Sequence, residues 1–483
     1  MRIPNILKDL IPAERLKPIL DLANQDKIAS LLKEVAEQVG WKGSTSNEST
    51  STKSFPPKEL QQAIRQAKWW FDSLSQRFQS ASVAPLQQGL NGTGELFSSR
   101  WIATPTSTDT VTAISMVHSG FCVSGGLTDS VETKLRQQTD AQACFVTSSV
   151  EAAILVLSAS FSSKNLYSES EAGQNPESHD YKSKPWIIAR RDCIRLPSEC
   201  DVLELLRSMN PAGVIEVGAS NDCQLQDYSR AITNGGGGVF RVTSAAIDEQ
   251  PINKFSVPTA VLAMTSLLRE FNEVPSNSTT VTNDRPLFSP LSNLNQSPSV
   301  QSLLGSGIDL VVYPGNGWLG GPLCGIVFGS EPTIEALRAT AKSLGLLAST
   351  STMAALRAAV EGNATLDLWL ESPIGQISSN GLSNLEHRAK KLIAQLEAAP
   401  NISSMRVDLK NVSVGTGLWR SITLESYCLL ASHSKFTTSE WQNQLAKRAV
   451  PIETLIQDGE LVVVLRTINP ADDQELVSAL LEE

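Results

Sequence analysis

The stretch Ile308–Gly325 reads IDLVVYPGNGWLGGPLCG and places a glycine-rich segment between two apolar runs. Leu310–Val312 is typical of a short buried strand, and the turn-forming sequence Pro314–Gly317 ends it. A second apolar run, Cys324–Phe328, predicts another strand. Because glycine has no Cβ, such a loop allows backbone to approach a ligand closely. An ordinary hairpin in a large α/β protein explains the same residues. This stretch alone therefore does not distinguish a ligand-binding loop from a hairpin.

Composition indicates a globular protein. The chain has 483 residues, of which 41% are hydrophobic and 19% charged, which is enough for about two or three domains with a sizeable core. The formal net charge of −10 argues against a dedicated nucleic-acid binder, which usually carries a basic face. Seven scattered cysteines without a CxxC pair are typical of reduced thiols in a cytoplasmic protein.

Several classes of protein are not expected. None of the four histidines pairs with another histidine or a cysteine at metal-ligand spacing, so we predict no metal site. The first residues, MRIPNILKDLIPAERL, lack the continuous apolar core of a signal peptide. No window of about 18 apolar residues occurs, so we predict no membrane span. We therefore expect a cytoplasmic protein.

The sequence divides into four parts. Residues 1–43 show helical spacing of apolar residues and predict a helical N-terminal unit, and residues 44–84 predict a polar linker followed by a helix. Residues 85–345 form a large domain, and residues 346–483 form a small α+β domain. Two polar stretches inside the large domain, 162–184 and 272–300, predict surface insertions with little structure of their own.

Strand and helix patterns alternate along the large domain. Predicted strands are Ala143–Thr147, Trp186–Ala189, Gly213–Val217, Val239–Val242, Leu310–Tyr313 and Cys324–Phe328. Predicted helices are Thr108–His118, Asp129–Gln138, Val150–Ser158, Asp201–Ser208 and Val257–Phe271. This alternation predicts a mostly parallel sheet covered by helices on both faces. In such sheets, ligands bind beyond the carboxyl ends of the strands.

The small domain mixes helices and strands. Predicted helices are Met353–Val360, Asn384–Glu397, Ser439–Arg448 and Asp472–Leu481, and predicted strands are Ser404–Leu409, Trp419–Leu424 and Leu461–Leu465. We find no internal repeat.

Five short motifs are spread in order along nearly the whole chain. They are RIPNILKDL at Arg2–Leu10, LNGTG at Leu90–Gly94, EVGASN at Glu216–Asn221, LGGP at Leu319–Pro322, and LRT with PADD at Leu465–Asp473. In these motifs and their order the chain resembles bacterial selenocysteine synthase (L-seryl-tRNA(Sec) selenium transferase), a family of pyridoxal-phosphate (PLP) enzymes. The resemblance implies the fold-type-I α/β architecture, with a mostly parallel seven-stranded-type sheet. It also implies a homodimer or higher homo-oligomer, a PLP cofactor and tRNA as a partner.

The same resemblance implies where the cofactor lysine should lie. Aligning Gly320-Gly321-Pro322 with the family motif SGDKLLGGP puts Gly317 at the lysine and Asn316 at the aspartate before it. No lysine occurs between Lys254 and Lys342, so a small shift of the alignment does not restore one. Glycine has no amine, and no Schiff base can form from this loop.

Other site positions implied by the resemblance have lost charge. The family histidine becomes Ser98, and the run GRRGSR falls in Phe121–Ser130, which has no arginine. Ser148 and Ser149 stand at the phosphate-side turn, where they either bind a phosphate or simply cap the next helix; Glu151 beside them would repel a phosphate.

Four further positions complete the candidate set. Asp284 is the candidate for the pyridine nitrogen, with an ordinary loop aspartate as the alternative, and Gly320 and Gly321 are candidates for close cofactor contact. Arg466 matches a basic residue of the family's LRT motif. It either holds a substrate carboxylate or makes a structural ion pair on a C-terminal strand.

Three hypotheses follow. The chain is a catalytically degenerate relative of selenocysteine synthase that acts by binding, without covalent PLP. Alternatively, it is an active selenium transferase with non-standard cofactor anchoring. The third hypothesis is an enzyme that carries out a different reaction in the family's cleft, using Cys324 or Cys223. Cys324 on a predicted strand also fits a buried core thiol.

Overall fold

Seven short strands, nearly all apolar, form the main sheet of the large domain. They are β2 (Ala143–Thr147), β3 (Trp186–Ala189), β4 (Val214–Val217), β5 (Gly238–Val242), β6 (Thr259–Leu262), β7 (Leu310–Pro314) and β8 (Gly325–Gly329). The structure is a computed structural model that describes residues 88–101, 104–119, 125–160, 183–219, 222–243, 255–270, 297–396 and 399–482. All residues of these strands except in β4 are buried, as expected for strands that are covered on both faces.

The strand order is β2-β8-β7-β6-β5-β3-β4. From β7 to β4 all neighbours pair in parallel, whereas β8 pairs antiparallel with both β2 and β7. The ten residues between β7 and β8 are too few for a parallel crossover, which needs a dozen or more, so β8 must return as a hairpin partner. The prediction of a mostly parallel sheet is confirmed, and the glycine-rich stretch is the hairpin connection.

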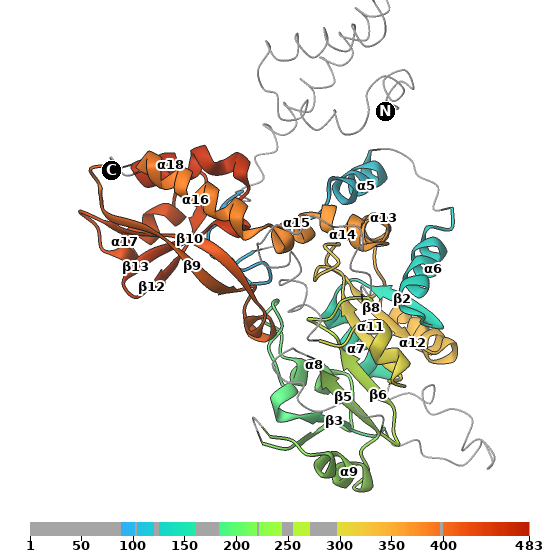
Figure 1. Cartoon of the computed structure of the whole chain (residues 1–483). Helices are drawn as coiled ribbons and strands as arrows, with labels where there is room; N and C mark the ends of the chain where they lie inside the picture. Colours follow the sequence, from blue (N-terminus) through green and yellow to red (C-terminus); the bar gives the residue numbers. More distant parts are fainter. Residues whose placement is uncertain are drawn as a thin grey trace, which may run out of the picture. The chain divides into compact units, whose positions relative to one another are not determined.

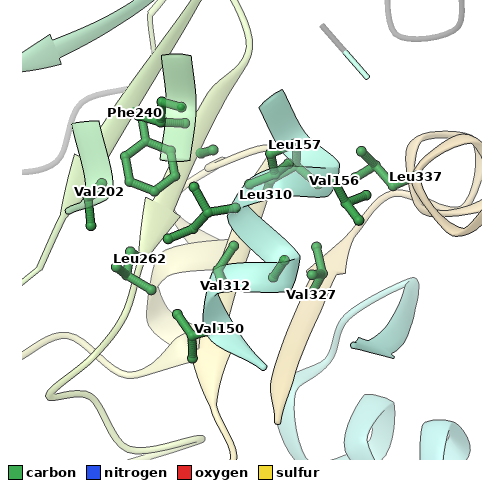
Figure 2. Close-up of a cluster of buried hydrophobic side chains, with 14 of the residues drawn as sticks. Val150, Val156, Leu157, Val202, Phe240, Leu262, Leu310, Val312, Val327 and Leu337 are labelled. Carbon is green, nitrogen blue, oxygen red and sulfur yellow. The ribbon is translucent and has the colours of Figure 1, made fainter. Parts of the chain in front are cut away.

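Helices cover the two faces of this sheet (Figure 1). Alternate strand residues such as Phe145, Leu310 and Val327 pack with α7 (Val150–Ser160), α8 (Val202–Ser208) and α12 (Glu331–Ser343). Figure 2 shows part of this cluster, with Val312 and Leu262 of the strands lying near Val150 of α7.

The intervening strand residues point to the other face. In β2, β6, β7 and β8 they pack there with α6 (Leu127–Thr139), α11 (Val300–Gly305) and α13 (Thr350–Glu361). In β3 and β5 they form a separate cluster with Tyr228 and Ala231. The alternation of buried residues between the two faces follows from the two-residue period of a strand.

A second, antiparallel sheet lies in the C-terminal part, in the order β12-β13-β10-β9. Its strands are β9 (Ile402–Ser413), β10 (Thr423–His433), β12 (Leu455–Gln457) and β13 (Glu460–Val464). One face packs on α16 (Leu382–Leu396), α17 (Thr438–Ala446) and α18 (Asp473–Leu481). A parallel pair of β1 (Leu90–Asn91) with β11 (Ile452–Glu453) joins the start of the described chain to this region.

The remaining described elements are short or peripheral. They are α5 (Thr108–His118), η1 (Arg190–Asp192), α9 (Leu225–Thr233), α14 (Leu366–Glu371), α15 (Pro373–Ser379), η2 (Gly417–Ser421), η3 (Leu465–Thr467) and η4 (Pro470–Asp472). No helix within the described ranges combines the length and the apolar character that a membrane crossing requires.

Two predictions of secondary structure are wrong. The predicted helix Val257–Phe271 contains the central strand β6 instead, because a four-residue apolar run bounded by Pro258 fits a fully buried strand as well as a helix face. The predicted strand Trp419–Leu424 begins instead as the 3₁₀ turn η2, and β10 starts only at Thr423. The predicted N-terminal unit, the linker and nearly all of both insertions lie outside the described residues.

Gly325 tests how tightly the hairpin packs on α7. A Cβ at this position would lie 2.5 Å from the Ser149 carbonyl oxygen and 2.7 Å from Thr147 Oγ1. We expect Gly325→Ala to lower the free energy of unfolding by about 1–3 kcal/mol, because neither neighbour can withdraw easily. Urea denaturation followed by circular dichroism measures this.

Gly305→Ala is the matched control, since nothing lies within 4 Å of a Cβ there and Gly305 is helical. We expect this control to be neutral or slightly stabilising. Equal stability of both variants would show that Gly325 does not pack closely against Ser149 and Thr147.

Candidate functional site

One row of the sheet register assembles the site. Thr147, the last residue of β2, is opposite Gly325, the first residue of β8, and Gly325 is in turn opposite Pro314, the last residue of β7. The segments that follow β2 and β7 therefore emerge at the same edge of the sheet. This edge is the carboxyl end of the parallel strands, where ligands bind in such folds.

A cavity of about 410 Å³ opens at this edge. Its walls come from the segment after β1, the turn between β2 and α7, the segment after η1, the ends of β6 and β7, the hairpin loop and η2. The lining residues are Leu96, Phe97, Ser98, Ser99, Trp101, Thr104, Ser148, Ser149, Val150, Glu151, Leu196, Pro197, Ser198, Met264, Pro314, Asn316, Gly317, Leu323, Cys324 and Trp419. Its size lies within the range of small-molecule sites.

Gly317 lies in the wall of this cavity. A Cβ at Gly317 would lie 3.3 Å from Pro314 Cγ, 3.6 Å from Trp419 Cη2 and 3.7 Å from the Met264 carbonyl oxygen. The backbone of Gly317 is not in the left-handed region, so a side chain fits after a small shift of the proline ring. Neither packing nor backbone conformation therefore requires glycine here.

The other loop glycines have packing reasons. A Cβ at Gly321 would lie 2.8 Å from the Gly315 carbonyl oxygen, and Gly320 has a φ of +62°. The Gly321 amide donates to the Gly315 carbonyl at 2.9 Å. Gly320 and Gly321 are buried and do not line the cavity, so the structure brings Ser148, Ser149 and Gly317 together without these two candidates.

The turn before α7 is held by hydrogen bonds within the protein. Ser149 caps the helix by accepting a bond from the Ala152 amide at 3.1 Å, which confirms the capping role. The Ser148 amide donates to the Leu346 carbonyl at 2.9 Å, and the Thr147 hydroxyl donates to the carbonyl oxygens of Ser149 and Gly325 at 2.8 and 2.9 Å. The alternative role of the two serines, binding a phosphate, stays a prediction.

Phe97 and Trp419 add an aromatic wall to the cavity, and Trp318 packs against both without lining it; the sequence pattern singled out none of the three. Phe97 stacks on Trp419 with ring centroids 3.9 Å apart. Trp318 meets both rings edge-on at 4.9 and 5.5 Å, and its indole N–H donates to the Thr265 carbonyl at 3.1 Å. The three residues are far apart in sequence, so only the order of aromatic residues in a related chain of known structure could have signalled this wall.

The cavity carries little charge. Among the described lining residues there is no lysine, arginine or histidine, and Glu151 is the single carboxylate. Glu151 lies in the first turn of α7 and accepts a hydrogen bond from the Ser198 hydroxyl. Ser98, which the resemblance predicts to stand at the family histidine position, lines the cavity. Asp284 lies outside the described residues. The segment that follows β6 contributes Met264 to the lining.

A buried cation close to this sheet edge is already engaged. Arg241 of β5 donates through Nε to Asp192 at 3.0 Å, and both side chains are almost fully buried. Burial raises the pKa of the Asp192 carboxyl, and Arg241 opposes that rise. Neither residue lines the cavity.

Pyridoxal phosphate makes three demands on a site. It needs an amine for the Schiff base, donors or cations for the phosphate and a carboxylate at the ring nitrogen. The described lining residues supply no amine and no cation, and their carboxylate stands at the helix N-terminus, where a phosphate would bind. These residues do not fit covalently bound PLP. In the part of the chain that the structure describes, no cluster of three or more His, Cys, Asp or Glu residues could hold a metal ion.

Arg466 is a structural bridge in the 3₁₀ turn η3. Its guanidinium donates to the backbone carbonyls of Ile377 and Asn380 at 2.9 Å each, and to that of Glu425 at 2.8 Å. The side chain is 4% exposed, and burial lowers the pKa of Arg466 to about 10. These hydrogen bonds go to carbonyl oxygens rather than to a carboxylate, so a carbonyl cradle takes the place of the expected structural ion pair. Arg466 does not line the cavity.

The two cysteines considered as nucleophiles are buried. Cys324 lines the cavity but is 1% exposed, and burial raises the pKa of its thiol to about 12. Cys223 is 2% exposed, and burial raises the pKa of its thiol as well. A nucleophilic cysteine needs a lowered pKa, so neither thiol is activated.

Comparison with solved structures agrees with this architecture. The structure of D-glucosaminate-6-phosphate ammonia-lyase superposes with a TM-score of 0.56 at 14% identity, covering 82% of this chain and 95% of that chain. Together with the strand order and the second antiparallel sheet, this likeness defines the class: the chain has the α/β fold of PLP-dependent fold-type-I proteins.

Sequence comparison then identifies the family. A family model described as L-seryl-tRNA selenium transferase matches residues 182–469, which is more than half of the chain, and the chain belongs to this family. The L-seryl-tRNA(Sec) selenium transferase of Alkaliphilus oremlandii is 24% identical over 310 residues, covering 62% of this chain and 63% of the relative. That of Aquifex aeolicus is 21% identical over 440 residues, covering 86% and 88%. The match to the first relative thus spans less than two thirds of its length.

The carbonyl cradle of Arg466 predicts a loss of stability on mutation. Arg466→Met leaves several buried carbonyls without a donor, and we expect the free energy of unfolding to fall by about 3 kcal/mol or more. Arg420→Met, at an exposed arginine of η2, should change it by less than about 0.5 kcal/mol. Chemical denaturation of both variants provides the measurement. Unchanged stability of Arg466→Met would contradict the structural role.

Proposed function

We propose that this chain is a selenocysteine-synthase-like protein that has lost the Schiff-base reaction of its family and acts by binding a ligand in the cavity. The observation that carries the proposal is Gly317, which lines the cavity with room for a Cβ and which alignment with the motif SGDKLLGGP puts at the family's lysine position. Selection for packing therefore does not account for the missing amine. The sheet that carries the site is present in the described part of the chain.

The electrostatics of the cavity support the same proposal. Each charge-assisted hydrogen bond to an anion contributes about 1.5–3 kcal/mol, and the described lining offers no cationic partner. The Ser149 hydroxyl already accepts the capping bond from α7. Losing several such contacts together removes much of the affinity for a phosphorylated cofactor.

An active selenium transferase is the alternative, and the family match across residues 182–469 is the observation that favours it. This alternative requires an amine that reaches the cavity from elsewhere, or PLP held without a covalent bond. It also requires that seryl-tRNA(Sec) binds, which filter binding at low salt measures directly.

A PLP titration separates the two. We expect purified protein to show no visible absorbance band of a pyridoxal Schiff base, with or without added PLP, and no site-specific lysine modified after borohydride reduction. Gly317→Lys should gain a band and a borohydride-trapped lysine at 317, but only at high PLP concentration, because phosphate ligands are missing.

Gly317→Gln is the matched control for this titration, since it adds bulk without an amine and should behave as the unmodified chain does. Peptide mass spectrometry locates any modified lysine and separates it from random surface reaction. A stoichiometric modified lysine in the unmodified chain would overturn the proposal and support the transferase.

We also propose a homo-oligomer, and the surface of α5 supports it. Among its described residues only Thr110 is buried, while Val111 is 53% and Met116 64% exposed. Exposed apolar side chains grouped on one helix are typical of an interaction surface.

Sedimentation velocity tests the oligomer. We expect the unmodified chain to sediment as a dimer or larger species, and the double variant Val111→Glu/Met116→Glu to shift towards monomer. Leu409→Glu, at an exposed leucine of β9, is the control and should leave the assembly unchanged. A monomeric unmodified chain would contradict the proposal.

A further inference from the structure

We propose that the cavity selects a flat heteroaromatic ligand without net charge, and that Glu151 excludes the phosphorylated form of such a ligand. This inference rests on the proposed function, because it treats the cavity as a binding site that forms no Schiff base. It goes further by naming the ligand chemistry and the residue that sets the specificity.

The position of Glu151 is the first observation. The N-terminus of a helix normally attracts anions through its free amides and its dipole. Here the carboxylate of Glu151, in the first turn of α7, stands at that positive end. The Ser198 hydroxyl, from the segment after η1, donates to this carboxylate and holds it beside the cavity, which both residues line. The favourable end of the helix is thus already occupied by a negative charge of the protein.

The lack of compensating charge is the second observation. Of the lining residues that the structure describes, none is cationic, and the buried Arg241 is committed to Asp192. A second anion entering next to Glu151 would meet a like charge in a partly enclosed space, where electrostatic repulsion is screened less than in water. A phosphate is therefore disfavoured, whereas a ligand without net charge pays no such penalty.

The walls of the cavity are the third observation. Phe97 and Trp419, stacked on one another, contribute aromatic surface, and Trp101 also lines the cavity. Aromatic surfaces favour flat aromatic ligands through stacking or edge-on contact. Hydroxyl and amide groups of Ser98, Thr104 and Asn316 lie in the same lining and match a ligand with hydrogen-bonding ring substituents. An apolar cavity with a few polar groups is the usual form of such a site.

Two pairs of probes test the inference by isothermal titration calorimetry on the full chain. Pyridoxine is compared with pyridoxine 5′-phosphate, and adenosine with adenosine 5′-monophosphate; within each pair only the phosphate differs. We expect a measurable affinity for at least one unphosphorylated probe and a preference of about 10-fold or more over its phosphorylated partner. Neither pyridoxine compound has an aldehyde, so no Schiff base can contribute to the result.

Glu151→Gln tests the role of the carboxylate. We expect this variant to bind the phosphorylated probe at least about 3-fold more tightly, with little change for the unphosphorylated one. Glu204→Gln is the matched control, because Glu204 also lies in the first turn of a helix, α8, but does not line the cavity. Circular dichroism confirms that both variants are folded.

The outcomes are distinct from those of the PLP titration. Equal or tighter binding of the phosphorylated probes by the unmodified chain, or no binding of any probe, would overturn the inference. A preference that persists unchanged in Glu151→Gln would overturn the role of Glu151. Failure of the proposed function would appear separately, as a lysine trapped by borohydride in the presence of PLP.

Discussion

The antiparallel insertion of β8 between β2 and β7 is the constraint on which the site depends. Because Thr147, Gly325 and Pro314 lie in one row of the register, the turn before α7 and the hairpin loop must emerge side by side. The contact is close, since Thr147 Oγ1 bonds the carbonyl of Gly325 and a Cβ at Gly325 would collide with Ser149. A larger residue at this point would separate the strands that define the cavity. The geometry of the cavity is therefore a consequence of backbone packing rather than of the side chains that line it.

This dependence separates residues that hold the fold from residues that only line the cavity. Gly321 and Gly325 are required by contacts with backbone carbonyls, and substitution there would disturb the sheet. Gly317 carries no such requirement and lines the cavity, so a small side chain there would not disturb the sheet. Arg466 illustrates the opposite case, because its charge is used to hold carbonyls of α15 and β10 together. A basic residue that survives in a divergent chain is thus as readily structural as functional.

Much of the fold could be predicted because its strands are short, apolar and separated by helical patterns. β2 and β3 begin and end where the sequence indicated, and α5 does as well. The prediction failed at β6, where Thr259–Leu262 belongs to an apolar run that fits either structure, and only pairing with β5 and β7 selects the strand. It failed again at Trp419, whose place in a 3₁₀ turn depends on packing against Phe97 and Trp318. Contacts between residues hundreds of positions apart produce no local sequence pattern, so they cannot be predicted from the sequence around either residue.

For the site, the sequence alone determined the family resemblance and, through it, the predictions that Gly317 stands at the lysine position and that basic site residues are missing, because a resemblance depends only on residue types and their order. Only the tertiary structure decided which of the candidates share a cavity. It brought Ser148, Ser149 and Gly317 together, left Gly320 and Gly321 outside the lining, and enclosed Arg466 in a carbonyl cradle. It also added the aromatic wall and the bond between Glu151 and Ser198. The physical reason is that strand order and register set which loop residues lie close together at the edge of a sheet. Long-range hydrogen bonding and burial together determine that order and register.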